Sequence, residues 1–143
     1  MARLDRERMM RGIFPHACEV PTRFGDMDVL GHINNVATAE LIQEGRVRFA
    51  HACGSAKLMT DFSSVVASLH IEYAKDMFYG APVTVRNAIV DIGRTSYRIA
   101  QMAGQNGEVG AFAETVLVLK GKTGTLEIPD AFREILERNR LSF

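Results

Sequence analysis

Apolar and polar residues alternate along four stretches in the second half of the chain. These stretches are residues 65–73, 83–92, 96–103 and 108–120. Successive side chains of a strand point to opposite faces of a sheet, so this alternation predicts four strands. Gly104-Gln105-Asn106-Gly107 separates the last two stretches, and Asn-Gly between alternating runs is a strong signal for a hairpin. The second half is therefore predicted to form an antiparallel sheet.

A long helix is predicted before these strands. Residues 36–52 contain no proline and are rich in residues that favour helices. Their apolar positions spread over more than one stripe, as expected of a helix that a sheet encloses. Residues 16–24 alternate and predict a first strand, in which Pro21 indicates an edge or a bulge. A short amphipathic helix is predicted after Ile128-Pro129-Asp130.

These elements predict an α+β fold in which an antiparallel sheet wraps around one long central helix. Residues 1–14 are expected to form an N-terminal arm with little to bury, either frayed or a short surface helix, and residues 15–143 a single domain. An open sheet leaves a strand edge exposed, so at least a homodimer is expected. Within the helix, Glu40 and Glu44 form a like-charge pair that needs compensation, from Arg46, Arg48 or a neighbouring subunit.

Composition excludes several functional classes. Lys and Arg total 17, as do Asp and Glu, which argues against a broadly basic surface for nucleic acid. The two cysteines lie far apart with no secretory signal before them, so reduced thiols in a cytoplasmic protein are expected. No stretch is apolar enough to span a membrane. No ligand spacing suggests a metal and no glycine-rich loop suggests a phosphate-binding cofactor site, so neither a metal nor a cofactor is expected.

Residues 26–35 concentrate the polar chemistry of the chain, with two carboxylates, a histidine and two asparagines just before the long helix. Gly25 and Gly31 allow the backbone to bend sharply there, and Asn34 or Asn35 can cap the helix. The first N–H groups of a helix carry partial positive charge, which suits an anion or a polarised carbonyl. This stretch is the candidate active site.

The string GDMDVLGHINN resembles the active-site signature of the hotdog-fold acyl-CoA thioesterases, in the branch that includes 4-hydroxybenzoyl-CoA thioesterase. In that family a G-D-x-D-x-x-G-H-[VI]-N-N string leads into the central helix. The segments EGRVRF and HIEYAKDMFYGAPVTVRNAI resemble the family's continuation, so the similarity covers roughly residues 19–119. The resemblance implies the hotdog fold, dimers that join their sheets, and active sites at the subunit interface, often within homotetramers.

The resemblance also assigns roles to residues. Asp28 matches the catalytic carboxylate and would act as nucleophile or general base on the thioester. The first free amides of the helix, around Asn35 and Val36, would stabilise the negative charge on the carbonyl oxygen. His32 would hydrogen-bond the substrate or hold Asp28. Asp26 would orient the loop.

Further residues are candidates for substrate binding. Asn34 belongs to the same string. Glu72 resembles a glutamate of the plant-type acyl-carrier-protein thioesterases. Those enzymes also carry a D-x-N-x-H string, which this chain matches except that Leu30 replaces the asparagine. If Glu72 is not part of such a network, it is expected to be a solvated strand residue. Arg94 and Ser96 follow a strand break at which relatives often place contacts to the phosphates of coenzyme A. Large apolar residues are candidates for lining or gating the site, namely Met59, Phe62, Met77 and Phe78.

The resemblance implies an acyl-CoA thioesterase that releases a free acid and coenzyme A. Three alternatives stay open: an acyl-carrier-protein thioesterase, a hotdog dehydratase or hydratase, and a non-catalytic acyl-thioester-binding protein. Related dehydratases place a histidine on or near the central helix, whereas His32 precedes the helix here and the G-D-x-D string favours hydrolysis. An intact Asp28 argues against the non-catalytic alternative.

Overall fold

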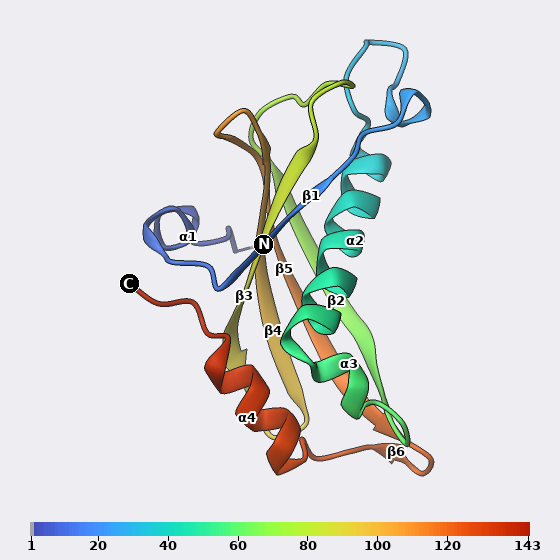
Figure 1. Cartoon of the computed structure of the whole chain (residues 1–143), viewed down its shortest axis with the longest axis vertical. Coiled ribbons are helices and arrows are strands. Elements are labelled where there is room, and N and C mark those ends of the chain that lie inside the picture. Colours follow the sequence, from blue (N-terminus) through green and yellow to red (C-terminus); the bar gives the residue numbers. More distant parts are fainter. Residues whose placement is uncertain (1) are drawn as a thin grey trace.

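The computed structural model describes residues 2–143, so of the predicted N-terminal arm only residue 1 lies outside the described residues. Figure 1 shows one long helix running along an elongated, curved sheet. The elements are α1 (Arg6–Arg11), β1 (His16–Val20), a 3-10 turn (Phe24–Asp26), α2 (Asn35–Cys53), α3 (Ser55–Leu58), β2 (Ser63–Tyr73), β3 (Val83–Ile92), β4 (Ser96–Gln105), β5 (Glu108–Gly121), β6 (Gly124–Thr125) and α4 (Asp130–Arg138). The predicted α+β fold is confirmed.

The sheet is antiparallel throughout, with the strand order β1-β3-β4-β5-β2 and with β6 pairing to β5. β1 is a short edge strand, and β2, eleven residues long, forms the other edge. The predicted hairpin between β4 and β5 is confirmed. Asn106 (φ 53°) and Gly107 (φ 80°) both lie in the left-handed region, as a two-residue turn between twisted strands requires.

Helix α2 begins and ends on local signals. The Oδ1 atom of Asn34 accepts a hydrogen bond from the N–H of Ala37 at 2.7 Å, and Gly54 ends the helix with a φ of 90°. The helix packs on β1, β3 and β4. Gly45 allows the closest approach, because a Cβ there would lie 2.4 Å from Cγ1 of Val85.

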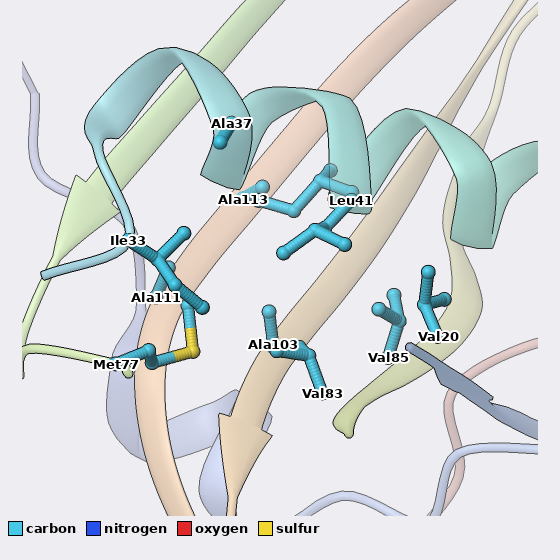
Figure 2. Packing of buried hydrophobic residues seen from close by; sticks show 11 residues of the cluster. Val20, Ile33, Ala37, Leu41, Met77, Val83, Val85, Ala103, Ala111 and Ala113 are labelled. Atoms are coloured by element: carbon cyan, nitrogen blue, oxygen red, sulfur yellow. The ribbon is translucent and has the colours of Figure 1, made fainter. Parts of the chain in front are cut away.

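Two clusters of buried apolar residues follow α2 from end to end. Around its first half, Ala37 and Leu41 project toward the sheet, where small side chains on β4 and β5 leave room for the helix (Figure 2). Around its second half, α4 closes the fold over a cluster of larger side chains, which includes Phe49, Ile89, Tyr97, Leu117, Phe132 and Leu136. The predicted face of α4 is confirmed by the burial of Phe132, Ile135 and Leu136.

The N-terminal arm forms a short helix, the second of the two forms expected for it. Residues 6–11 form α1, which lies on the opposite face of the sheet from α2 (Figure 1). Met9 is 3% exposed and packs with Ala100, Met102 and Phe112, side chains that alternate with those facing α2. The expectation that this segment has little to bury is therefore wrong, because the sheet offers it an apolar face.

The first strand is shorter than predicted. It ends at Val20 rather than at residue 24, because Pro21 has no N–H to donate to the ladder. The chain then enters the 3-10 turn. In residues 2–143, none of the helices has the length and hydropathy needed to cross a membrane.

Candidate active site

The loop between β1 and α2 folds back on itself, so that Asp28 and His32 lie at its tip. An isolated bridge joins Met27 to Ile33, and the N–H of Asp28 donates to the carbonyl of His32 at 2.8 Å. Gly31 makes the return possible, because its φ of 84° is strained for residues with a Cβ. The loop leads directly into α2, as the sequence predicted.

Asp28 is held by one carboxylate oxygen only. Its Oδ1 accepts hydrogen bonds from the N–H groups of Leu30 (2.9 Å) and His32 (3.2 Å). Its Oδ2 accepts no hydrogen bond from residues 2–143, and the residue is exposed. The backbone therefore fixes the carboxylate while one oxygen stays free to attack an electrophile or to take a proton.

Asp26, two residues earlier, is arranged in the opposite way. Its side chain is 4% exposed, and it accepts from the backbone N–H of Arg23 (2.8 Å) and from the guanidinium of Arg23 (2.9 and 3.2 Å). Its carbonyl also accepts from the N–H of Asn34 at 2.9 Å. Asp26 joins the two ends of the loop and has no free oxygen for chemistry.

The start of α2 offers free hydrogen-bond donors beside this loop. Asn34 caps the helix through its side chain, so its Oδ1 is already engaged. The N–H groups of Asn35 and Val36 have no acceptor within the described part of the chain. Both residues are exposed, and the hydroxyl of Tyr73 at the end of β2 donates to the Asn35 carbonyl at 3.0 Å. A carbonyl oxygen placed against these amides would also gain from the helix dipole.

The imidazole of His32 turns toward the loop before β3 rather than toward Asp28. Its ring meets Phe78 edge-on at 5.4 Å between centroids, and its Nε2 lies 3.6 Å from Oδ2 of Asp76. His32 thus contacts Asp28 through its backbone, with its side chain left at the mouth of the site. Tyr73 and Asp76 were missed as site residues, although both belong to the segment HIEYAKDMFYG that resembles the family.

Large apolar side chains surround the tip of the loop and point to solvent. Val29 is 102% exposed, and the others are Phe24 (73%), Leu30 (74%), Val36 (65%), Phe78 (51%) and Tyr79 (49%). A pocket of about 350 Å³ lies next to them, lined by Ile33, Thr38, Tyr73 and Met77 among others. A chain of this kind would bury such a surface against a substrate or another protein chain.

A larger groove, of about 470 Å³, follows the outer side of α2. Its charged side chains are already paired, Arg23 with Glu40 and Arg48 with Glu44. These pairs supply the compensation that the like-charge pair Glu40 and Glu44 needed. Both hollows reach the first turn of α2, the groove at Ala37 and the smaller pocket at Thr38, but only the smaller pocket is also lined by Tyr73. No group of three or more His, Cys, Asp or Glu side chains in residues 2–143 is placed to hold a metal ion.

Glu72 is not brought to Asp28. Its carboxylate lies under the N-terminal arm, where it accepts from the N–H of Leu4 (2.7 Å) and from Nε of Arg6 (2.7 Å), and its side chain is 12% exposed. The N–H of Leu4, then Arg6 and His70, lower the pKa of Glu72 against the opposing effect of burial. The sequence context suggested a solvated strand residue. The structure instead shows Glu72 largely covered by the N-terminal arm.

Four other candidates lie at the far end of the molecule. Arg94 lies in the turn between β3 and β4, and Ser96 is the first residue of β4. Because β3 is ten residues long, roughly 30 Å separates them from the loop before α2 within one chain. Arg94 donates to Glu127 at 2.7 Å. Met59 and Phe62 pack with Phe132 in the apolar cluster under α4, whereas Met77 and Phe78 lie at the candidate active site.

Comparison with known proteins identifies the family of the chain. The profile of the thioesterase-like superfamily matches residues 22–136. A thioesterase from Thermus thermophilus, solved with coenzyme A and zinc, is 31% identical with a TM-score of 0.77, over 86% of this chain and 98% of that one. A predicted thioesterase from Bacillus stearothermophilus is 29% identical with a TM-score of 0.80, over 89% of this chain and 97% of that one.

More distant structures share the fold alone. One is a 1,4-dihydroxy-2-naphthoyl-CoA thioesterase from Synechocystis, 13% identical with a TM-score of 0.73, over 84% of this chain and 93% of that one. A search of curated proteins gave no match. The chain therefore belongs to the thioesterase-like superfamily, with the hotdog fold and the thioester hydrolase activity that its sequence predicted.

Proposed function

We propose that the protein is an acyl-CoA thioesterase in which Asp28 is the nucleophile or general base. The observation that carries this proposal is the half-engaged carboxylate of Asp28. Two backbone N–H groups fix its Oδ1, and its Oδ2 is free at the tip of a loop that runs straight into α2. A group held in this way needs no rearrangement to react with a substrate bound at the helix start.

The reaction follows from these groups. The thioester carbonyl oxygen would accept hydrogen bonds from the N–H groups of Asn35 and Val36, which stabilise the negative charge that develops on it. As nucleophile, Asp28 would attack the carbonyl carbon, expel the coenzyme A thiolate and form an anhydride that water then hydrolyses. As general base, it would take a proton from the attacking water, and the thiolate would leave from the tetrahedral intermediate. Both routes yield a free acid and coenzyme A.

The other candidates have supporting parts in this proposal. His32, at the mouth beside Asp76 and Phe78, would contact the substrate after it enters. Asn34 would act through the helix cap that orients the oxyanion donors, leaving only its Nδ2 for the substrate. The thioesterase of Thermus thermophilus, solved with coenzyme A, supports a coenzyme A ester as substrate. The apolar side chains around Asp28 suit a hydrophobic acyl group.

We propose further that the site is completed in a homodimer or homotetramer. The long edge strand β2 carries unpaired backbone groups and exposed apolar side chains, including Val65, Val66 and Leu69. If two copies pair through β2 in antiparallel fashion, the far end of one sheet lies beside the near end of the other. Arg94 and Ser96 of the second copy would then lie at the same end as Asp28, where the phosphates of coenzyme A could reach them.

Light scattering at micromolar concentration should therefore give the mass of a dimer or tetramer. Arg94→Ala should raise KM for an acyl-CoA ester and leave kcat nearly unchanged, because it would remove ground-state binding only. Arg138→Ala, which removes an exposed arginine of α4, is its control. A monomer that hydrolyses thioesters normally would contradict the interfacial site.

A panel of thioesters tests the function itself. Short, long, branched and aromatic acyl-CoA esters, together with their acyl-carrier-protein counterparts, would be monitored for release of free thiol. We expect thiol release from at least one class of coenzyme A ester, with slower release from its carrier-protein counterpart. Hydration of an enoyl thioester without thiol release would favour the dehydratase alternative. Tight binding of an acyl-CoA without turnover would favour a non-catalytic protein.

A further inference from the structure

Arg46 lies on the sheet-facing side of α2, in the middle of the fold. It is 9% exposed, and its Nη1 donates to Oε1 of Gln101 (3.3 Å) and to Oγ1 of Thr115 (3.2 Å). Gln101 and Thr115 are 0% exposed. Gln101 donates in turn to the carbonyl of Ile42 (2.9 Å) and to Oδ1 of Asn87 (2.7 Å). The guanidinium is therefore embedded in a row of neutral polar groups.

The charge of Arg46 has no counter-ion in the described part of the chain. The acids of α2 pair with other arginines, Glu40 with Arg23 and Glu44 with Arg48. Burial lowers the pKa of Arg46, which reflects the cost of keeping the cation away from water. A buried charge without a counter-ion destabilises the folded state, so a compensating anion would stabilise the fold.

Arg46 also has free donors that reach open space. Only its Nη1 is engaged by residues 2–143, and no fully enclosed side-chain nitrogen or oxygen among them lacks a partner. The Nε and Nη2 groups must therefore reach accessible space. Arg46 lines a pocket of about 20 Å³ between α2, α4 and the strands β3 and β4, whose other walls are mostly apolar, among them Phe49, Ile89, Ile99 and Leu136.

The size of this pocket limits its occupant. A volume of about 20 Å³ is enough for one water molecule or one ion of similar size and too small for an acyl chain. The polar neighbours offer few further donors, because the hydroxyl of Ser55 bonds to the Ala50 carbonyl (3.3 Å) and the amide of Asn139 to the Ile135 carbonyl (2.8 Å). Any anion held there depends on Arg46.

We infer that this pocket binds one small monovalent anion of about the size of chloride, held by the Nε and Nη2 groups of Arg46. The anion would neutralise the buried guanidinium and join α2 to α4. The site is separate from the thioesterase site, because Arg46 follows Asn35 by eleven positions, roughly 16 Å along the helix. Halide is therefore expected to affect stability rather than the chemical step.

Bromide is the probe that tests this site. Crystals of the full chain grown in sodium bromide should show an anomalous peak within hydrogen-bond distance of the Arg46 guanidinium. In solution, bromide would replace gluconate, which is too large for the pocket, at constant ionic strength. At ten times its dissociation constant, bromide should raise the melting temperature by roughly 3 to 5 °C.

Two variants assign the effect. Arg46→Met removes the cation and fills space with an apolar side chain, so its melting temperature should be the same in both salts. Arg48→Met, which removes an exposed arginine from the same helix, should keep the dependence on bromide. Should Arg46→Met fail to fold, the bromide peak and the melting of the wild-type protein in the two salts still test the inference. The absence of a bromide peak at Arg46, or equal wild-type melting in bromide and gluconate, would overturn the inference.

Discussion

The two ends of α2 differ in how they treat large apolar side chains. The loop before the first residues of α2 exposes such side chains to solvent, whereas α3 and α4 cover the last residues of α2 and bury their own apolar side chains. Phe24 is 73% exposed at the first end, and Phe132 is 0% exposed at the second. The hydrogen bonds differ in the same way, because Asp28, Asn35 and Val36 keep free groups at the first end. At the second end the apolar side chains are buried within one chain. At the first end apolar side chains stay exposed and hydrogen-bonding groups stay free.

This contrast separates what holds the fold together from what carries the chemistry. Burial of aromatic and aliphatic side chains under α4 stabilises the domain at the second end. The loop before α2 is stabilised instead by local hydrogen bonds, with Asp26 engaged and Asp28 half free. Substitutions at the two ends should therefore lower different quantities, stability at one and turnover at the other.

The largest effect is expected from Asp28→Asn. The amide can still accept through Oδ1 from Leu30 and His32, so the loop should keep its shape, but it cannot act as nucleophile or base. Turnover should fall by roughly 10²- to 10⁴-fold with little change in acyl-CoA binding or melting temperature. Single-turnover hydrolysis, acyl-CoA binding and thermal melting measure the three quantities.

Asp61→Asn is the matched control for Asp28→Asn, since it removes an exposed carboxylate at the other end of the molecule. It should leave both turnover and melting unchanged. Near-normal turnover in Asp28→Asn would contradict the assignment of Asp28 as the catalytic carboxylate. A loss of turnover that only reflects unfolding of the variant would contradict it as well.

Phe132→Ala tests the closed end. Phe132 packs against Phe62 (5.7 Å between centroids) and Tyr97 (5.6 Å), and its truncation should cost about 3–5 kcal/mol of unfolding free energy. This corresponds to a drop of roughly 10 °C or more in melting temperature. The variant should keep near-normal turnover at temperatures where it is folded.

Phe24→Ala removes the same ring at the open end. It should change the melting temperature of one subunit little, because the ring is mostly exposed and contacts chiefly Tyr79. Its effect should appear in substrate binding or in subunit association. A large loss of subunit stability in Phe24→Ala, with none in Phe132→Ala, would reverse the comparison.

Asp26→Asn separates the two carboxylates of the motif. The buried carboxylate would lose its ion pair with Arg23 and at least one charge-assisted hydrogen bond, at a cost of about 1.5–3 kcal/mol. Melting should fall by roughly 5 °C. Turnover should fall only as far as the loop loses order, so binding and rate should weaken together. Abolished turnover in a stable Asp26→Asn, beside an active Asp28→Asn, would exchange the roles proposed for them.

Local signals allowed the sequence to predict much of the fold and the start of α2 beside the candidate site. The strand Val83–Ile92 has the predicted bounds, the cap at Asn34 sets the start of α2, and Asn106-Gly107 forms the predicted turn. Asp28 and the first amides of the helix are neighbours in sequence, so a contiguous motif was enough to propose them as parts of one site.

The features that the sequence did not predict depend on contacts between residues that are far apart in the chain. Glu72 binds Leu4 and Arg6, more than sixty positions away, and no local pattern indicates that pairing. Of the partners expected for the acids of α2, Arg48 pairs with Glu44, whereas the sheet buries Arg46 among neutral groups. The distance of Arg94 from Asp28 depends on strand order, which periodicity alone does not give.

The smallest effect is expected from Glu72→Gln. Because Glu72 lies under the N-terminal arm and not beside Asp28, turnover should stay within a few-fold of wild type. A loss of about 10²-fold with unchanged melting would instead place Glu72 in a catalytic network of the acyl-carrier-protein type. Met10→Ala, at a 59% exposed position of α1, is the control for a change in the arm that leaves the carboxylate intact.

The pH dependence of the arm sharpens this last prediction. The pKa of Glu72 is lowered from 4.5, chiefly by the N–H of Leu4, so the folded protein binds the proton less readily than the unfolded chain. The stabilisation is therefore complete above about pH 4.5 and is lost as the pH falls through the lower folded pKa. Hydrogen exchange at Leu4 should show protection at pH 7 that weakens below pH 4.5 in the wild type. In Glu72→Gln one accepting oxygen and the ion pair with Arg6 are lost, so protection at pH 7 should be weaker than in the wild type and should not change as the pH falls. Equal protection in the two proteins at pH 7 would mean that the carboxylate does not hold the arm.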